Sequence, residues 1–324
     1  MRVFVTGATG WVGSAVVNEL VSSGHQVTGL TTTPAGAQRL QALGAKAHVG
    51  RLSQHALLRE AAAQSDGVIH TAFIHGLSHM NLPTRLRLFV GALNGGIVPS
   101  FMRTLLETES GAIEALGSGL EGSQGALIVT SGILFLPPGR VSTEEDDHVG
   151  STGRSFSETA ALGLIARGVR SSVVRLAPTV HGAGDHGFIP QIIEAARKKR
   201  VSPYIGDGAN RWPTVHRLDA ARLFRLALEK GEAGARYHGV DEQGVPFRDI
   251  ASAIAGKLQI PAVSIPAEKA SKHFGMLANF VGVDSPASSA WTRQALGWAP
   301  EQAGLMADMD AHYFQGPASM RAAA

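Results

Sequence analysis

The chain has 324 residues, of which 44% are apolar and 17% are charged, and its formal net charge is +3. This length allows one large α/β domain or two joined lobes with a real core. The composition excludes a disordered chain, and no apolar stretch approaches the roughly 18 residues of a membrane-spanning helix. Because the sequence has no cysteine, disulfides, thiolate metal sites and cysteine nucleophiles are also excluded.

The same properties limit the possible partners. Basic residues are scattered, and no basic face with interleaved aromatic residues is visible, so we expect no nucleic-acid and no membrane partner. The thirteen histidines lack metal-ligand spacing, which predicts no metal site. A strand begins at once and leaves no room for a signal peptide. We therefore expect a cytoplasmic monomer or homodimer that acts on a small molecule.

A strand, a glycine turn and a helix follow one another at the N-terminus. Residues 2–6 are rich in β-branched side chains, and apolar residues with helical spacing lead from Gly13 to Gly24. In this context Gly7 permits a tight turn, Gly10 lets the backbone approach a pyrophosphate, and Gly13 allows close packing of helix and strand. Free N–H groups at the helix start bind phosphate. The predicted contacts are Gly7, Thr9, Gly10, Trp11, Val12 and Gly13.

Strands and helices continue to alternate along the first half of the chain. Further strands are predicted at 26–30, 45–49, 66–72, 126–131 and 172–176, with helices that include 35–43 and one capped by Ser53. This alternation predicts an α/β fold with a Rossmann-type, doubly wound parallel sheet, whose ligands lie at the carboxyl ends of the strands.

The predicted dinucleotide-binding domain covers residues 1–177. Residues 178–324 are expected to form mainly a smaller C-terminal substrate-binding lobe, from which some segments return to the Rossmann core. Its predicted helices cover 188–200, 219–230 and 247–258, and its short strands lie near 201–205 and 237–240.

The residues after the second strand indicate the choice of cofactor. Proteins that prefer NAD usually place a carboxylate there, whereas this chain has Thr31 and Thr32, which do not repel a 2′-phosphate. Arg39 or Arg51 could supply a positive charge. NADP(H) is therefore favoured over NAD(H), and the alternative is that Thr33 with the following proline only starts a helix.

Five segments, taken in order, resemble the extended short-chain dehydrogenases of the NAD-dependent epimerase/dehydratase group. They are VTGATGWVG at 5–13, IVTSG at 128–132, VVRLAPTVHG at 173–182, VHRLD at 215–219 and LGWAP at 296–300. The resemblance implies that Ser131 is the catalytic serine and that the segment at 173–182 passes the nicotinamide. The further predicted cofactor contacts are Arg51, Leu52, Thr71, Ala72, Phe73, Ala177, Pro178 and Val180.

One part of the family pattern is missing. These enzymes use Tyr-x-x-x-Lys on the helix after the fifth strand, where the lysine lowers the pKa of the tyrosine. None of the three tyrosines, Tyr204, Tyr237 and Tyr313, has a lysine four residues on. The matching helix instead has Arg154 at the tyrosine position and Glu158 at the lysine position, as in atypical members of the group.

The predicted catalytic residues are Ser131, Arg154 and Glu158. Ser131 would hydrogen-bond a substrate oxygen, although it could also only cap a strand end. Arg154 cannot serve as an acid, because its pKa lies above about 12, but it could stabilise negative charge. The i, i+4 spacing of Arg154 and Glu158 also fits a plain helix salt bridge.

The replacement proton donor and the substrate contacts are predicted from the loops. His75 and His79 follow the fourth strand, and His181, Asp185 and His186 follow the sixth; a histidine can donate a proton near neutral pH, and water held by Ser131 is an alternative. The predicted substrate contacts are His75, His181, His186, Arg211 and Trp212. The apolar residues Phe73, Leu134, Phe135 and Trp212 suggest a hydrophobic substrate, and the acidic run 144–147 is expected to be a solvated surface loop.

Three functions are compatible with these residues. The leading hypothesis is an NADP(H)-dependent oxidoreductase that reduces a small, hydrophobic carbonyl or imine compound. The second is a non-redox isomerase, lyase or cyclase that keeps the nucleotide pocket as a scaffold. The third is a non-catalytic NADP-binding sensor protein, which the missing tyrosine and lysine make plausible.

Overall fold

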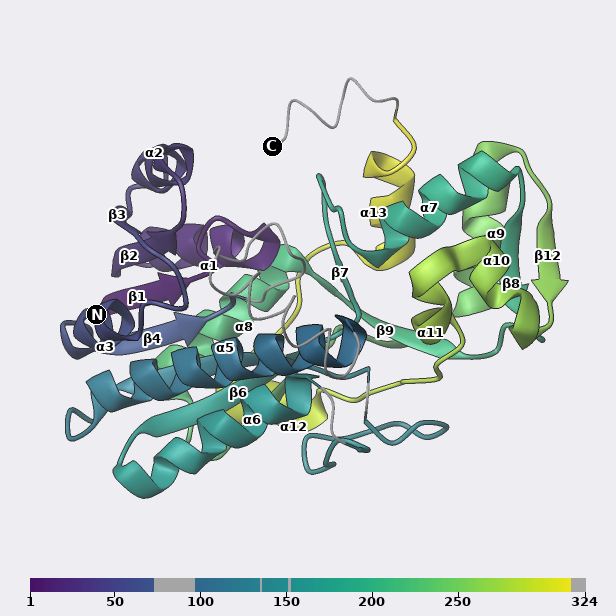
Figure 1. Cartoon of the computed structure of the whole chain (residues 1–324). Helices are drawn as coiled ribbons and strands as arrows, with labels where there is room; N and C mark the ends of the chain where they lie inside the picture. Colours follow the sequence, from purple (N-terminus) through teal and green to yellow (C-terminus); the bar gives the residue numbers. More distant parts are fainter. Residues whose placement is uncertain (73–96, 135, 151–152, 316–324) are drawn as a thin grey trace. The chain divides into compact units, whose positions relative to one another are not determined.

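The computed structural model describes residues 1–72, 97–134, 136–150 and 153–315, with side chains except at 97–105 and 153–154 (Figure 1). The chain divides into two compact units. Unit 1 contains Met1–Ser131, Ser151–Val174 and Phe224–Arg236, and unit 2 contains Gly132–Gly150, Arg175–Leu223 and Tyr237–Ala324. Unit 1 is therefore built from three separate stretches of sequence.

The larger sheet has seven strands in the order β10-β6-β5-β4-β1-β2-β3. The strands are β1 (Arg2–Thr6), β2 (Gln26–Thr31), β3 (Lys46–Val49), β4 (Gly67–His70), β5 (Ala126–Gly132), β6 (Arg170–Leu176) and β10 (Arg236–Gly239). Strand β1 pairs in parallel with both β2 and β4, and β4 pairs in parallel with β5. The direction of winding reverses between β1 and β4, which is where such sheets bind ligands. The predicted Rossmann-type α/β fold is confirmed.

Helices cover both faces of this sheet (Figure 1). They are α1 (Trp11–Ser22), α2 (Pro34–Ala42), α3 (His55–Ala63), α5 (Ile97–Leu120), α6 (Gly153–Gly163) with the 3₁₀ turn Leu164–Arg167, and α8 (Arg217–Lys230). Leu58 of α3, Ile113 of α5 and Ala161 of α6 join strand residues in one buried cluster. On the other face, Arg225 and Glu229 of α8 bind Glu19 and His25 beside α1.

Unit 2 contains a three-stranded sheet in the order β11-β9-β7 and a parallel pair, β12-β8. The strands are β7 (Thr179–His181), β8 (Ser202–Ile205), β9 (Arg211–His216), β11 (Glu242–Pro246) and β12 (Ala262–Ile265). The helices are α7 (Phe188–Lys199), α9 (Phe247–Leu258), α10 (Ala270–Phe274), α11 (Ala278–Val281), α12 (Ala290–Leu296) and α13 (Leu305–His312), with 3₁₀ turns at Ala267–Lys269 and Gly275–Leu277. Isoleucine and aromatic side chains from α7, α9 and α10 surround Trp212 in its core.

One local prediction is corrected: the N-cap of α3 is Gln54, one residue after the predicted Ser53. The strand expected near 237–240 is β10, which pairs in the seven-stranded sheet although Tyr237–Ala324 belongs to unit 2.

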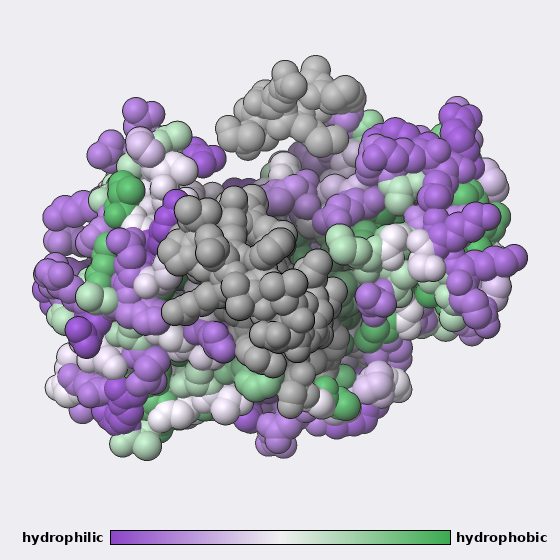
Figure 2. Space-filling model, in the orientation of Figure 1, coloured by the Kyte–Doolittle hydropathy of each residue, from purple (hydrophilic) through white to green (hydrophobic). Residues whose placement is uncertain are grey.

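The visible face of the molecule is mostly hydrophilic, with scattered apolar spots (Figure 2). Large exposed apolar side chains such as Met276 and Phe156 are far apart in sequence. Among the described residues, no helix combines the length and apolarity required to span a bilayer.

Candidate functional site

The glycine loop after β1 has the geometry that a dinucleotide requires. Gly7 has a φ of +67°, and a Cβ at this position would lie 2.6 Å from the backbone nitrogen of Ala72. The N–H of Gly10 donates to the carbonyl of Gly7 at 2.8 Å, which closes the turn. A Cβ on Gly13 would lie only 2.0 Å from the Gly7 carbonyl oxygen. Only glycine fits at positions 7 and 13, as the sequence predicts.

The loop leads directly into the start of α1. Gly10 is the N-cap of this helix and provides no side-chain cap, so the helix begins with backbone N–H groups available to an anion. Thr9, Trp11 and Val12 are half-buried beside it. Thr71, which follows β4, links the ends of β4 and β1, because its hydroxyl donates to the carbonyl of Thr6 at 2.8 Å. These residues fit the diphosphate of a nicotinamide dinucleotide.

The end of β2 contains no carboxylate, and one of the threonines that follow it has a structural role. Thr33 is the N-cap of α2, where its hydroxyl accepts a hydrogen bond from the Gly36 N–H at 3.0 Å. The helix-start interpretation therefore holds for Thr33. Thr31 is buried, whereas Thr32 and Arg51 are exposed and within reach of solvent ions. Their role in choosing NADP(H) stays a prediction.

The predicted catalytic residues lie on β5 and α6. Ser131 is 2% exposed at the end of β5, and Arg154 is in the first turn of α6, where its side chain lies outside the described residues. Glu158 is buried and forms an ion pair with Arg236, in which the Nε–Oε1 distance is 2.6 Å. The lysine position of the family motif thus holds a carboxylate that is neutralised from β10.

We predict that Glu158 contributes to stability through Arg236. Glu158→Ala should lower the free energy of unfolding by about 2 kcal/mol, less than the ~3–5 kcal/mol of a fully buried pair because Arg236 is partly exposed. Urea denaturation of Glu158→Ala, Arg236→Ala and the double variant measures the coupling energy between the two side chains. Additive effects of the two single substitutions would contradict the pairing.

Four buried polar side chains are linked by hydrogen bonds into a row, here called the buried polar chain, which the sequence analysis did not predict. The Thr6 hydroxyl lies 2.7 Å from His70 Nδ1, and His70 Nε2 lies 3.3 Å from Glu109 Oε1. The Ser157 hydroxyl donates to the same carboxylate oxygen at 3.3 Å. All four residues are at most 2% exposed. The available signal was the position of Glu109 on α5. It lies three, four and seven residues before the buried apolar residues Ala112, Ile113 and Leu116, which places it on the apolar face of the helix.

In unit 2, two histidines lie side by side at the ends of parallel strands. His181 of β7 and His216 of β9 are register partners, and their rings meet edge to face with centroids 5.4 Å apart. His181 is buried, and its Nδ1 lies 2.9 Å from Asp308 Oδ2 of α13. His216 Nδ1 accepts a hydrogen bond from the Leu218 N–H at 3.2 Å. His181 therefore has a buried partner that the sequence did not indicate.

Tyr313 connects the end of the chain to the loop after β7. Its hydroxyl donates to Asp185 Oδ2 at 2.8 Å and accepts from the Gly182 N–H at 3.2 Å. Burial raises the pKa of both the Asp185 carboxyl and the Tyr313 hydroxyl. Asp185 therefore keeps a proton to higher pH than an exposed carboxyl does. His186, in the same loop, is exposed.

The stability of the protein should fall in mild acid partly because of His216. Burial, and next the charge on His181, lowers the pKa of His216, so the folded state binds a proton less readily than the unfolded state. This contribution is present above the ordinary histidine pKa of about 6.5 and is lost as the pH falls below it. Urea denaturation between pH 7.5 and 5.5 should show a weaker pH dependence for His216→Gln than for the wild type. Equal slopes would contradict the assignment.

Two predicted substrate contacts already have structural partners. Trp212 is fully buried, and its ring packs on Phe188 and Phe247 at centroid distances of 5.6 and 5.2 Å, so it belongs to the core of unit 2 and does not line a surface. Arg211 binds the carboxylate of Asp284 through Nε and Nη2 at 3.0 and 2.9 Å. This pairing raises the pKa of Arg211 and lowers that of Asp284.

The acidic run at 144–147 is only partly a solvated loop, which corrects the prediction. Glu145 and Asp147 are exposed, but Glu144 is 7% exposed. Its Oε1 accepts hydrogen bonds from the N–H and the hydroxyl of Thr292 at 2.9 and 2.6 Å. The carboxylate is buried because it satisfies the first turn of α12, where a negative charge is favoured.

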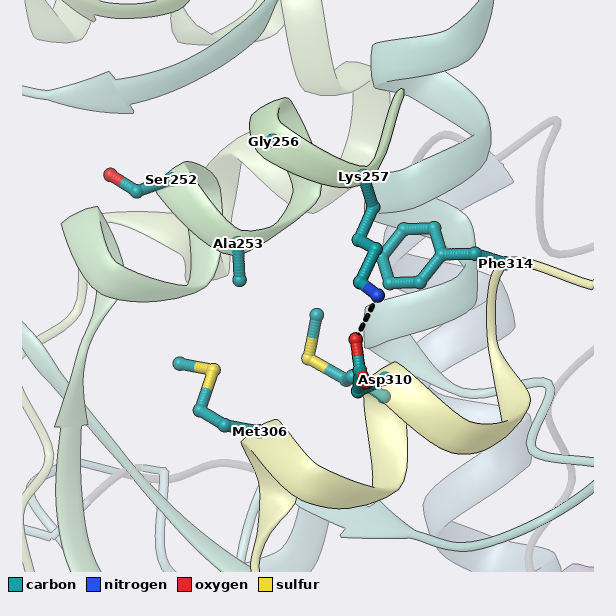
Figure 3. Close-up of a pocket in the computed structure, with 8 residues that line it drawn as sticks. Ser252, Ala253, Gly256, Lys257, Met306, Asp310 and Phe314 are labelled. Carbon is teal, nitrogen blue, oxygen red and sulfur yellow. Dashed lines mark ion pairs between the residues drawn. The ribbon is translucent and has the colours of Figure 1, made fainter. Parts of the chain in front are cut away.

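Unit 2 also has an open hollow of about 390 Å³ between α9 and α13 (Figure 3). Met306, Met309 and Phe314 line it with apolar surface, and Lys257 pairs with Asp310 across it. No predicted site residue lines this hollow. In the part of the chain that the structure describes, no group of three or more potential ligands could hold a metal ion.

Comparison with known proteins identifies the family. Residues 3–87 match the NAD dependent epimerase/dehydratase family. An uncharacterized protein of Schizosaccharomyces pombe is 42% identical over 97% of this chain and 100% of its own length. The chain belongs to the NAD-dependent epimerase/dehydratase family. A more distant relative, 26% identical over 85% of this chain and 80% of its own length, is the 4-hydroxy-2-methyl-3-oxo-4-farnesyl-3,4-dihydroquinoline-1-oxide ketoreductase of Stigmatella aurantiaca.

A solved structure has the same fold as this chain. It is the dTDP-glucose 4,6-dehydratase DesIV of Streptomyces venezuelae, with NAD and TYD bound. The likeness covers 97% of this chain and 96% of that one, with a TM-score of 0.72 and 18% identity. At this identity the likeness concerns the fold alone.

Several predicted contacts of this epimerase/dehydratase family member remain predictions. Phe73, His75, His79 and Phe135 lie outside the described residues. In unit 2, Ala177 is buried and donates its N–H to the Gly239 carbonyl at 3.2 Å. The other predicted contacts, Leu52, Ala72, Pro178 and Val180, are half-buried.

Proposed function

We propose that this protein is an NADP(H)-dependent reductase of small, hydrophobic carbonyl or imine compounds. The observation that carries the proposal is the fit of the Gly7–Gly13 loop to a dinucleotide diphosphate, since a side chain at either end of the loop would strike backbone atoms. The relative named as a ketoreductase supports a redox reaction on this fold.

The residues of the chain have separate roles in this reaction. When bound, the reduced nicotinamide supplies a hydride. The N–H groups at the start of α1 hold the diphosphate, and Ser131 donates a hydrogen bond to the carbonyl oxygen of the substrate. Arg154 stabilises the negative charge that develops on this oxygen, but it cannot supply the proton because its pKa is above about 12. A loop histidine or a water molecule held by Ser131 supplies that proton.

Two features support the finer parts of the proposal. The end of β2 has Thr31 and Thr32 where a carboxylate would repel the 2′-phosphate of NADP(H). Arg51 is exposed and directly follows Gly50, whose N–H donates to the Thr31 carbonyl at 2.8 Å. The named substrate of the Stigmatella ketoreductase carries a farnesyl chain, which is in line with a hydrophobic substrate. DesIV contains NAD, so the preference needs a direct measurement.

Titration with NADPH and NADH, followed by nicotinamide fluorescence, tests the pocket. We expect NADPH to bind at least tenfold more tightly than NADH. Loss of absorbance at 340 nm is then measured with a panel of aliphatic ketones, 2-alkyl-3-oxoalkanoates, 3-oxosteroids and cyclic imines. Ser131→Ala should lower turnover by about 100-fold, as for the loss of one oxyanion donor. Failure to bind either nucleotide at millimolar concentration would refute the proposal.

A nucleotide-binding sensor is the second candidate. It is favoured by Glu158, which stands where the family has its catalytic lysine and forms an ion pair with Arg236. Tight binding of NADPH without turnover of any compound in the panel would support this function over the reductase.

A further inference from the structure

The buried polar chain of unit 1 has no role in the reaction described so far. We propose that Glu109, together with His70 and Ser157, is a positioning group of the active site, which holds α6 against the end of β4. This inference rests on the proposed function, because it concerns the arrangement of Ser131 and Arg154 in that same site.

Glu109 is buried in apolar surroundings, which makes its carboxylate energetically costly. Its side chain is 2% exposed, and Ala112 and Ile113 of the same helix are in the hydrophobic cluster of unit 1. Burying a carboxylate and an imidazole costs free energy that apolar side chains of similar size do not cost. The hydrogen bonds of a buried polar network instead favour one arrangement of the elements that they join.

The hydrogen-bond directions in the chain follow from the carboxylate, which can only accept. His70 Nε2 faces Glu109 Oε1 and therefore carries a proton, so in the neutral ring Nδ1 accepts from the Thr6 hydroxyl. The Ser157 hydroxyl donates to Glu109 as well. One carboxylate oxygen thus joins β4 to α6 through α5.

Both joined elements lead to predicted catalytic residues. Ser157 lies three residues after Arg154 on α6. The carbonyl of His70 accepts a hydrogen bond at 2.9 Å from the hydroxyl of Thr130, the residue before Ser131. A change at Glu109 should therefore displace the residues that act on the substrate.

The glycine loop is also held by hydrogen bonds in which Glu109 takes no part. The Gly10 N–H binds the Gly7 carbonyl, and the Thr71 hydroxyl binds the Thr6 carbonyl. We therefore expect substitutions in the polar chain to reduce turnover while the affinity for the nucleotide is kept. A general loss of stability would instead lower the fraction of active protein and leave the turnover of the folded fraction unchanged.

The test compares Glu109→Gln, which keeps the shape of the side chain, and Ser157→Ala with the wild type. The matched control is Thr159→Ala, which removes an exposed hydroxyl from the same helix, where it donates to the Ser155 carbonyl. NADPH is the nucleotide probe, and the substrate probe is the panel compound that the wild type reduces fastest. Circular dichroism and gel filtration establish the folded fraction of each variant.

We expect Glu109→Gln and Ser157→Ala to lower kcat at least tenfold, with KM and the NADPH Kd within twofold of the wild type. Backbone hydrogen exchange in residues 153–163 should be faster in both variants, and Thr159→Ala should match the wild type. If the wild type turns over its substrate and both variants have the same kcat as the wild type, this inference alone is overturned. Absence of NADPH binding or turnover in the wild type would overturn the proposed function and this inference with it. A parallel loss of NADPH affinity would also contradict a role confined to α6 and the strand end.

Discussion

Gly13→Ala should abolish nucleotide binding and lower the free energy of unfolding by roughly 3 kcal/mol. The added Cβ would lie 2.0 Å from the Gly7 carbonyl oxygen and 2.8 Å from the Thr71 hydroxyl oxygen. The first of these neighbours is backbone, so no side-chain rotation relieves the contact. The helix start must move away from the turn, and its N–H groups then no longer converge on one diphosphate.

NADPH titration and urea denaturation of the same protein samples measure both effects. Gly163→Ala is the matched control, because a Cβ at this position at the end of α6 meets nothing within 4 Å. That substitution should leave NADPH binding unchanged and should not destabilise the protein. Retention of wild-type NADPH affinity by Gly13→Ala would show that the loop does not bind the nucleotide as we propose.

Asp308→Ala should destabilise the protein by about 3–5 kcal/mol. The carboxylate is 3% exposed and is hydrogen-bonded to His181, which is 1% exposed, so its removal leaves a buried imidazole without its partner. His312, one turn further along α13, also loses an ion-pair partner at 3.6 Å. Thermal and urea denaturation at pH 7.5 provide the measurement.

Asp310→Ala is the control for this prediction. Asp310 lies two residues further along α13, and its ion pair with Lys257 is exposed on both sides, so we expect a loss of at most about 0.5 kcal/mol. Equal destabilisation by the two substitutions would mean that the His181 contact is no more important than a surface pair.

The sequence was sufficient to predict strands β1 to β6 and the glycine loop, because both depend on local patterns, whereas β7, β9, β11 and β12 were not predicted. The run at 2–6 and the spacing of Gly7, Gly10 and Gly13 allow few other backbones. The pairing of the edge strand β10 with the large sheet could not be predicted, since four residues near Tyr237 do not specify which sheet they join.

Side-chain partners were much harder to predict than elements. Glu158 and Arg154 have the spacing of a helix pair, but the partner observed for Glu158 is Arg236, 78 residues further along the chain. Trp212 has the polar N–H of a binding residue but is enclosed by aromatic rings. Such contacts depend on tertiary packing, which a single sequence does not display. The partners of Glu109 were missed as well, although a carboxylate on an apolar helix face indicates a buried polar partner.

The origin of unit 1 in three stretches of sequence has a consequence for biosynthesis. The last stretch of unit 1, residues 224–236, and strand β10 are synthesised after residues 132–150 and 175–223 of unit 2. Until then, β6 presents an unpaired edge of the kind that promotes aggregation. Expression of residues 1–177 alone should consequently give an insoluble fragment, and a protein ending at 239 is the shortest in which every strand of the large sheet is present.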